Sequence, residues 1–326
     1  MRHDAPTRRR AITIFAAAAA SCMVGGPTRP REPDYEWRGV AMGADATILF
    51  SGIEPENARE VIVAASAEID RLEGALSLFR DDSELRRLNR EKLLHLPSGD
   101  LRRALALALN VAGLSRGLFD PTVQALWEAH VDWFAAAPDA GLPPEEVIGK
   151  ARAAVDWRRI LVRPDTISIA ADQRLTLNGL GQGYVTDRVA NLLYSRGLQN
   201  VLVDLGEQRA LGPRQRGEPW LVARANAAPF ALTSGALATS EGSGCVLGAS
   251  GAVHHLFDPR NGRSAAHWTK VTVHHGSAAV ADALSTALYV ASSAEIEALL
   301  PRFAGTMVWA TDHDGHERRW ISPPVS

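Results

Sequence analysis

The chain has few cysteines, no long apolar run and no excess of positive charge. Its two cysteines, Cys22 and Cys245, are too few for a disulfide framework or a thiolate zinc site, so any bound metal would need oxygen or histidine ligands. No apolar run reaches the roughly 18 to 20 residues that a membrane-spanning helix needs. Because 35 basic residues stand against 37 acidic ones, the chain lacks the basic field that nucleic-acid binding requires. Nucleic acid is therefore not an expected partner.

Composition and periodicity indicate a globular domain with mixed secondary structure. Hydrophobic residues make up 46% of the 326 residues, enough for a packed core. Apolar residues that recur about every 3.6 positions predict helices over residues 57–77, 99–115, 145–154, 187–195 and 281–291. Short apolar runs predict strands over residues 46–50, 160–162, 167–169, 175–177, 201–205, 220–224, 271–273 and 307–311. Without a regular βαβ repeat, this order favours a layered α+β fold.

The first 26 residues are typical of a signal peptide. An arginine run that includes Arg8 and Arg9 precedes an alanine-rich apolar stretch over residues 11–24. The paired arginines fit a twin-arginine export signal, and an ordinary secretory signal is the alternative. We therefore expect a protein exported to the periplasm.

Two features at the end of this signal bear on where the folded domain starts. Cys22 closes a weak lipobox, so we expect membrane attachment only if this cysteine is lipidated. Three prolines within eight residues favour an extended tether, which predicts a linker over residues 27–36 and a folded domain over 37–326.

A glycine-rich segment is one candidate for substrate binding. Gly179, Gly181 and Gly183 alternate with other residues between a predicted strand and a predicted helix. Backbone N–H groups at such a junction can approach phosphate oxygens. The spacing differs from the dinucleotide fingerprint, so the phosphate signal is weak on its own.

Asp282 and Thr286 form a candidate metal site. They stand four residues apart in a segment of small apolar residues, so a helix would place both on one face. A carboxylate and a hydroxyl that converge in this way suit Mg²⁺ shared with substrate phosphates. The alternative is that Asp282 caps the helix and Thr286 bonds its own backbone.

Three further segments are ambiguous when taken alone. The pair His254 and His255 precedes an Asp-Pro turn and is a candidate for acid or base chemistry, although solvated loop histidines are common. Asp120, in Gly-Leu-Phe-Asp-Pro-Thr, fits a helix-to-helix corner in which it serves as a cap. Residues 238–244 form a small hydroxyl-rich loop or a plain turn.

In their order and spacing, seven segments of the chain closely resemble the ApbE family of FAD:protein FMN transferases over roughly residues 37–322. These are Met42-Gly43, the run 76–85 (Leu-Ser-Leu-Phe-Arg, then Asp-Ser-Glu-Leu), Gly-Leu-Phe-Asp-Pro-Thr at 117–122, Gly-x-Gly-x-Gly-Tyr at 179–184, Val-Asp-Leu-Gly at 203–206, His-x-x-Asp-Pro at 255–259 and Ala-Asp-Ala-x-x-Thr-Ala at 281–287. Each segment is weak alone, and the ordered set is specific.

The resemblance implies an enzyme with a layered, T-fold-like catalytic domain. Such an enzyme would use Mg²⁺ to cleave FAD, release AMP and join FMN to a Thr or Ser hydroxyl of a client flavoprotein. The twin-arginine signal and the sequence around the glycines resemble the NosX branch, whose implied client serves nitrous oxide respiration.

The resemblance also implies roles for individual residues. Asp282 and Thr286 would bind the metal with their side chains and Gly179 with its carbonyl, and His255 would activate the client hydroxyl. The residues implied to line the flavin, adenine and pyrophosphate regions are Met42, Phe79, Leu118, Phe119, Asp120, Thr176, Gln182 and Leu256.

Two positions depart from the family pattern. Thr176 stands where an acidic residue is usual, and Gln182 stands where Lys or Glu is common. The loss of charge at both positions puts the details of FAD binding in doubt. Two alternatives therefore stay open: a Mg²⁺-dependent FAD pyrophosphatase without a protein acceptor, and a non-catalytic flavin-binding chaperone.

Overall fold

The computed structural model describes residues 34–323 except 225–226, 250 and 252. The predicted signal peptide, Cys22 and all of the predicted linker except its last residues lie outside this part. No helix in the described part is long and apolar enough to cross a membrane.

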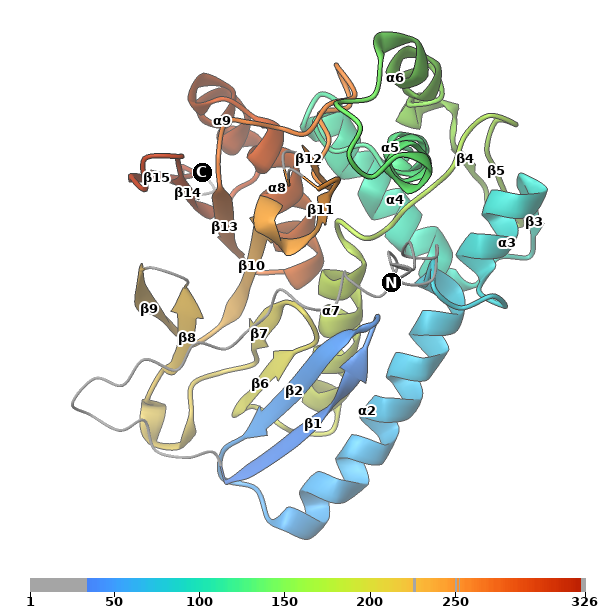
Figure 1. Ribbon diagram of the computed structural model, residues 1–326. Coiled ribbons are helices and arrows are strands. Elements are labelled where there is room, and N and C mark those ends of the chain that lie inside the picture. Colours follow the sequence, from blue (N-terminus) through green and yellow to red (C-terminus); the bar gives the residue numbers. More distant parts are fainter. Residues whose placement is uncertain (1–33, 225–226, 250, 252, 324–326) are drawn as a thin grey trace, which may run out of the picture.

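An antiparallel sheet of eight strands forms the centre of the fold (Figure 1), in the order β1-β2-β6-β7-β10-β13-β14-β15. Its strands are β1 (Tyr35–Ala41), β2 (Ala44–Phe50), β6 (Val201–Asp204), β7 (Gln208–Ala210), β10 (Gly235–Glu241), β13 (Lys270–His275), β14 (Met307–Thr311) and β15 (Glu317–Ile321). Every neighbouring pair is antiparallel. Short connections join three of the antiparallel pairs, β1–β2, β6–β7 and β14–β15.

Three helices pack along this sheet. They are α2 (Pro55–Leu76), α7 (Gly181–Ser195) and α8 (Ala278–Val290). Helix α8 contacts β10 and β13 on one side and α7 on another, while α2 contacts α7 and β1. Helix α8 carries small apolar residues on nearly every side, which explains how it can be buried between the sheet and the other helices.

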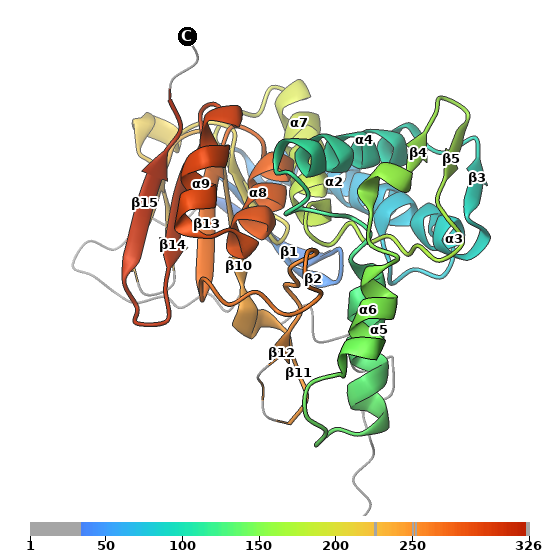
Figure 2. The ribbon, with the colours of Figure 1, turned by 90° about the horizontal axis from the view of Figure 1, so that it is seen from above.

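The remaining elements surround this layer. The helices are α3 (Glu84–Glu91), α4 (Gly99–Leu114), α5 (Gln124–Ala136), α6 (Glu145–Arg152) and α9 (Ser293–Leu299). The strands are β3 (Leu93–His95), β4 (Leu161–Val162) and β5 (Thr166–Ser168) in one small sheet, and the hairpins β8 (Trp220–Arg224) with β9 (Ala227–Leu232) and β11 (Val246–Leu247) with β12 (Val253–His254). Figure 2 shows α5, α6 and the β11–β12 hairpin projecting together from one side of the molecule.

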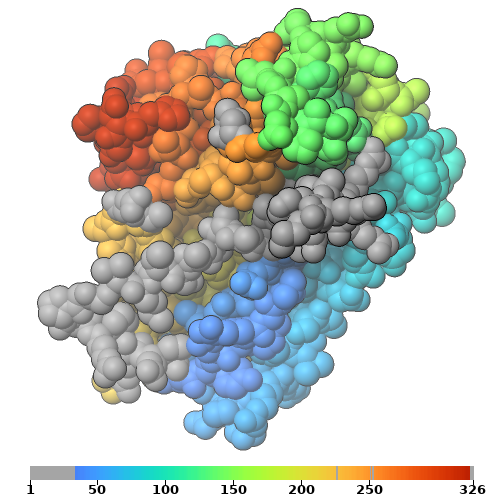
Figure 3. Space-filling model, in the orientation of Figure 1, coloured from blue at the N-terminus to red at the C-terminus, as the bar shows by residue number. Residues whose placement is uncertain are grey.

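The β1–β2 hairpin lies on the same face of the molecule as the projection formed by α5, α6 and the β11–β12 hairpin. Figure 3 shows the β1–β2 segment in blue on the same face as the α5–α6 segment in green and the β11–β12 segment in orange. These three segments, which are far apart in the sequence, therefore lie on one face of the molecule.

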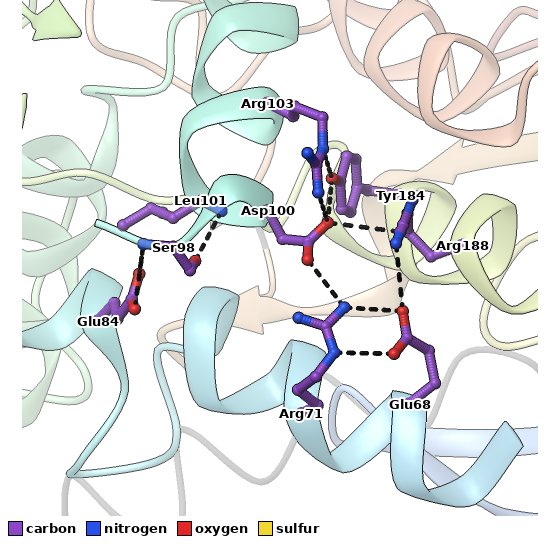
Figure 4. A network of polar contacts seen from close by, with 9 residues as sticks. All are labelled: Glu68, Arg71, Glu84, Ser98, Asp100, Leu101, Arg103, Tyr184 and Arg188. Atoms are coloured by element: carbon purple, nitrogen blue, oxygen red, sulfur yellow. Dashed lines mark hydrogen bonds and ion pairs between the residues drawn. The ribbon is translucent and has the colours of Figure 1, made fainter. Parts of the chain in front are cut away.

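A network of charged side chains joins α7 to α2 and α4 (Figure 4). Asp100 of α4 is buried and accepts hydrogen bonds from the Tyr184 hydroxyl at 2.7 Å and from Arg103 at 2.8 Å. Arg71 of α2 lies 2.8 Å from the other oxygen of Asp100. Burial alone would raise the pKa of Asp100, but the hydrogen bonds from Arg103, Tyr184 and Arg71 outweigh it and lower the pKa to about 2. This network fixes the first turn of α7.

The predicted α+β class is confirmed, but the strand expected over residues 175–177 is wrong. Leu175 pairs with a side chain: its N–H donates to Asn89 Oδ1 at 2.7 Å, and Asn89 Nδ2 donates to its carbonyl at 2.8 Å. The Thr176 N–H donates to the Pro121 carbonyl at 2.8 Å. An apolar run with such partners looks like a strand in the sequence but forms no ladder.

Three other expectations also need correction. Helix α7 starts six residues earlier than predicted, at Gly181, because tertiary packing overrides the low helix propensity of glycine. Residues 238–241 belong to strand β10 and are not a loop. Strand β15 follows the run over 307–311 that was expected to be the last strand; its polar sequence, Glu-Arg-Arg-Trp-Ile, gave no apolar signal.

Candidate active site

Asp282 lies in the second turn of α8, within the buried layer. Its Oδ2 accepts a hydrogen bond of 3.0 Å from the backbone N–H of Gly183 on α7. Helix α8 starts at Ala278, and its N-cap is Ser277, whose hydroxyl accepts the Val280 N–H. The interpretation of Asp282 as a helix cap is therefore wrong, because the helix already has its cap one turn earlier.

In the part of the chain that the structure describes, the Asp282 carboxylate lacks a cationic partner. Burial raises its pKa to about 7, against the hydrogen bond from Gly183, and the nearby charge of Asp187 contributes to the rise. Among the described residues, no lysine or arginine forms an ion pair with Asp282. The ionised form of such a buried carboxylate is costly unless a cation binds to it, and a proton neutralises it otherwise.

Thr286 and Gly179 meet one helical turn from Asp282. A Cβ added to Gly179 would lie 3.0 Å from Thr286 Oγ1, so the absence of a side chain at Gly179 allows this close approach. Thr286 Oγ1 also lies 3.4 Å from the hydroxyl of Ser240 on β10. The structure thus places Gly179 beside Thr286, one turn of α8 from Asp282.

These groups fit the predicted metal by their chemistry. A carboxylate, a hydroxyl and a backbone carbonyl are hard oxygen donors of the kind that Mg²⁺ prefers, and they leave coordination positions for phosphate oxygens. Asp282 also supplies the negative charge that its surroundings do not balance.

The glycine-rich segment is the first turn of α7. Gly183 faces α8 so closely that an added Cβ would lie 2.3 Å from the carbonyl oxygen of Ala278. Gln182 packs over Gly206, which has a φ of 104° and no room for a side chain. Both contacts depend on glycine, and together they place the helix start beside Asp282.

Two of the predicted flavin and adenine residues border this segment, and a third lies beside the β1–β2 turn. The Phe119 ring lies 3.1 Å from the position that a Cβ of Gly179 would take, and the Met42 methyl lies 3.3 Å from that of Gly181. Phe79 packs over the β1–β2 turn, 3.6 Å from the corresponding position of Gly43. The predicted residues from the start of the chain and from its middle are therefore neighbours.

Leu118 and Asp120 are buried beside Phe119, and hydrogen bonds to Asp120 stabilise the corner of the chain in which it lies. The Asp120 carboxylate accepts hydrogen bonds from the N–H and hydroxyl of Thr122, at 2.8 and 2.6 Å, and from the Trp157 N–H at 3.1 Å. Burial raises its pKa. Thr176 is tied to the same corner through Pro121, so both residues shape the wall next to Phe119.

His255 and Leu256 follow strand β12. The Nδ1 atom of His255 lies 3.3 Å from the Cys245 carbonyl, which also accepts the His255 backbone N–H at 3.1 Å. Because a carbonyl only accepts, Nδ1 carries the proton and Nε2 the lone pair. Burial lowers the pKa of His255 to about 4, so the ring is neutral at pH 7. Leu256 is buried directly after it.

One member of the histidine pair, His254, contacts Tyr289 of α8. The rings of His254 and Tyr289 lie 5.6 Å apart, and both pack against Gly242 at the end of β10. Tyr289 stands three residues after Thr286, so the histidine segment adjoins the next turn of the helix that carries the metal candidates.

Sequence reasoning missed three acidic residues around this centre. Asp187 binds the start of α8, Glu207 is buried and accepts the Thr239 N–H at 3.2 Å, and Glu73 accepts the Met42 N–H at 2.6 Å. Burial and the charges of Asp282 and Asp204 raise the pKa of Glu207. Only Asp187 had a signal in the sequence, since it stands four residues after Gly183 on one helix face.

Buried oxygen donors beside a glycine-rich helix start, within a mixed helix and sheet layer, are the arrangement that the resemblance to the ApbE family implied. The model of the ApbE family matches residues 42–309, and the chain belongs to this family. The prediction of family and of a transferase enzyme is confirmed.

Curated relatives and solved structures agree with this assignment. The FAD:protein FMN transferase of Salmonella typhimurium is 25% identical, with 96% of this chain and 95% of the relative covered. That of Vibrio cholerae is 29% identical, with 85% and 86% covered. The structure of flavin transferase ApbE from Vibrio cholerae matches with a TM-score of 0.76 at 24% identity, over 88% of this chain and 96% of that one. The apo flavinyl transferase ApbE of Pseudomonas stutzeri gives 0.74 at 25% identity, over 88% and 94%.

Proposed function

We propose that this protein is a Mg²⁺-dependent FAD:protein FMN transferase. The observation that carries the proposal is the buried Asp282 carboxylate, which faces the glycine-rich start of α7 and has no cationic partner among the described residues. The names of the curated relatives support the reaction. FAD is the flavin donor, and the acceptor is a Thr or Ser hydroxyl of a client flavoprotein.

The reaction exchanges the phosphoanhydride linkage of the FAD pyrophosphate for a phosphoester linkage to the client. The client hydroxyl oxygen attacks the FMN phosphorus of FAD, the bond from that phosphorus to the bridging pyrophosphate oxygen breaks, and AMP leaves with that oxygen. The hydroxyl proton passes to His255 Nε2, whose ring is neutral because burial lowers its pKa. His255 is therefore the candidate base.

Positioning and charge neutralisation supply most of the catalysis in such a transfer. Asp282, Thr286 and Gly179 are the groups that would hold Mg²⁺, which neutralises pyrophosphate charge when bound. Met42, Phe79, Leu118 and Phe119 offer apolar surface for the rings of FAD. The corner that contains Asp120, together with Gln182 and Leu256, would form the protein surface around the bound FAD.

The client and the compartment are proposed from the sequence alone. Arg8 and Arg9 support twin-arginine export to the periplasm, and the likeness to the NosX branch supports a client in nitrous oxide respiration. Replacement of both arginines by lysine should leave precursor in the cytoplasm. Unchanged periplasmic yield would contradict the proposed route.

The activity can be tested with the purified protein, FAD, Mg²⁺ and a periplasmic flavoprotein domain. We expect covalent flavin fluorescence on the client after denaturing electrophoresis, with one AMP released per flavin attached. Asp282→Asn should abolish most of this transfer, and Asp312→Asn, on the turn after β14, serves as a matched control that should keep it. AMP without labelled client would indicate a pyrophosphatase, and bound FAD without AMP would indicate a flavin chaperone.

A further inference from the structure

The first turn of α8 is held by a side chain from another helix. A helix start leaves backbone N–H groups without partners inside the helix. At α8, the Ala278 N–H donates to Asp187 Oδ1 at 2.9 Å and the Ala279 N–H to Asp187 Oδ2 at 3.1 Å. The Ser277 hydroxyl donates to the same Oδ2 at 2.6 Å. One buried carboxylate on α7 thus receives three hydrogen bonds from the start of α8.

Asp187 also contacts a cationic side chain. Arg209 of β7 forms a short ion pair with Oδ1, and its side chain is only 19% exposed. An ionised carboxylate is favoured next to the positive end of a helix dipole. The contact is therefore electrostatically strong and also directional.

A second contact runs in the opposite direction one turn away. Gly183 precedes Asp187 by four residues on α7, and Asp282 follows Ala278 by four residues on α8, so each pair shares one helix face. Asp187 accepts from the start of α8, while Asp282 accepts from the Gly183 N–H near the start of α7. The two contacts fix how far α8 is shifted along α7 and how it is rotated.

Helix α7 is itself held from elsewhere. Its Tyr184 hydroxyl donates to Asp100 in the network drawn in Figure 4. Asp187 therefore positions α8 against a helix that is already fixed to α2 and α4. Asp282 and Thr286 both lie further along the α8 segment that starts at this contact.

We propose that Asp187 is a positioning residue for the metal site: it sets the register of α8 so that Asp282 and Thr286 face Gly179. This inference rests on the proposed function, because that proposal supplies the metal site. A purely structural cap would stabilise α8 without any effect on metal affinity.

The test is the affinity for Mn²⁺, used as a paramagnetic probe for Mg²⁺ and followed by electron paramagnetic resonance in the presence of FAD, without client. Asp187→Asn removes the charge and should weaken Mn²⁺ binding at least tenfold. Ser292→Ala is the matched control, because it removes the cap of α9. This control should lower the unfolding temperature and leave Mn²⁺ affinity within twofold.

The outcomes separate the two proposals. If wild type binds Mn²⁺ and Asp187→Asn loses only thermal stability, Asp187 is an ordinary cap and the inference is wrong. If wild type binds no Mn²⁺, the metal site of the proposed function fails, and this inference fails with it. Should Asp187→Asn not fold, Ser277→Ala removes one of the three hydrogen bonds to Asp187, together with the cap bond from Val280, and should weaken Mn²⁺ binding at least threefold. An unchanged affinity in that variant would overturn the inference.

Discussion

The backbone N–H of Gly183 donates a 3.0 Å hydrogen bond to Asp282 Oδ2, and this contact joins the glycine-rich start of α7 to the acidic centre of α8. It requires the two helices to approach more closely than side chains normally permit. A Cβ on Gly183 would lie 2.8 Å from the Asp282 Cβ, as well as 2.3 Å from the Ala278 carbonyl. Glycine at this position serves helix packing as well as the site.

Gly183→Ala should therefore damage both stability and flavin binding. The added methyl must push α8 away from α7, and overpacking of this kind costs about 1 to 3 kcal/mol of unfolding free energy. Because Asp282 moves with α8, we expect weaker FAD binding in the presence of Mg²⁺. Chemical denaturation and a flavin fluorescence titration measure the two effects.

Gly149 of α6 provides the matched control. A Cβ there would meet nothing within 4 Å, so alanine should stabilise the helix by roughly 0.5 to 1 kcal/mol and leave FAD binding unchanged. The close-packing explanation would be wrong if the two substitutions changed stability in the same direction.

Asp282→Asn and Thr286→Val should differ in severity. Loss of the carboxylate should lower the transfer rate by roughly two orders of magnitude or more, since it removes the charge at the metal site. Loss of one neutral hydroxyl should do less harm. Neither substitution should lower the stability of the metal-free protein much, because the buried Asp282 charge has no cationic partner in the described part of the chain. Single-turnover flavinylation and thermal unfolding in a chelator give both readouts. Equal rates for wild type and Asp282→Asn at saturating Mg²⁺ would refute the metal assignment.

Asp100 should stabilise the fold in a pH-dependent way. Its folded-state pKa of about 2 lies below the ordinary value of 3.8, so its contribution is complete above pH 4 and is lost as the pH falls towards 2. At pH 7, Asp100→Asn should cost roughly 2 to 3 kcal/mol, because the contacts between the buried Asp100 and partly exposed arginines lose their acceptor charge.

The difference between wild type and Asp100→Asn should shrink below pH 4, which denaturation at several pH values can follow. Glu91→Gln breaks an exposed pair with Arg90 and should change stability by less than about 0.5 kcal/mol. A difference that stays constant from pH 7 to pH 2.5 would show that charge is not the cause.

The sequence predicted the long helices of this fold better than it predicted the side-chain contacts around the candidate site. Helices such as α2 and α4 have a clear apolar period, and the i to i+4 spacing of Asp282 and Thr286 predicted their common face correctly. The partnership of Asn89 with Leu175 could not be predicted, because it joins residues 86 positions apart through a side chain. Glu207 was missed for the same reason: its partners come together only in the folded sheet.

The last prediction concerns the protonation of His255. Burial lowers its pKa to about 4, and the Cys245 carbonyl holds the proton of the neutral ring on Nδ1. A base with this pKa is neutral from pH 8 down to about pH 5, whereas an ordinary histidine would be half protonated near pH 6.5. If His255 accepts the client proton, the transfer rate at saturating Mg²⁺, where the bound cation keeps Asp282 ionised, should not fall between pH 8 and pH 5.5 and should decline only towards pH 4. His255→Gln should lose most of the rate at every pH, while His313→Gln, on the exposed turn after β14, should keep the wild-type profile.

The stability of the fold should depend on the protonation of His255 at a higher pH than the rate does. The unfolded chain takes up a proton below about pH 6.5 and the folded one does not, so folding weakens as the pH falls from 6.5 to 4. A rate that already falls by half near pH 6.5, in wild type but not in His255→Gln, would show that the ring titrates as an exposed histidine and that the Cys245 contact does not set its state.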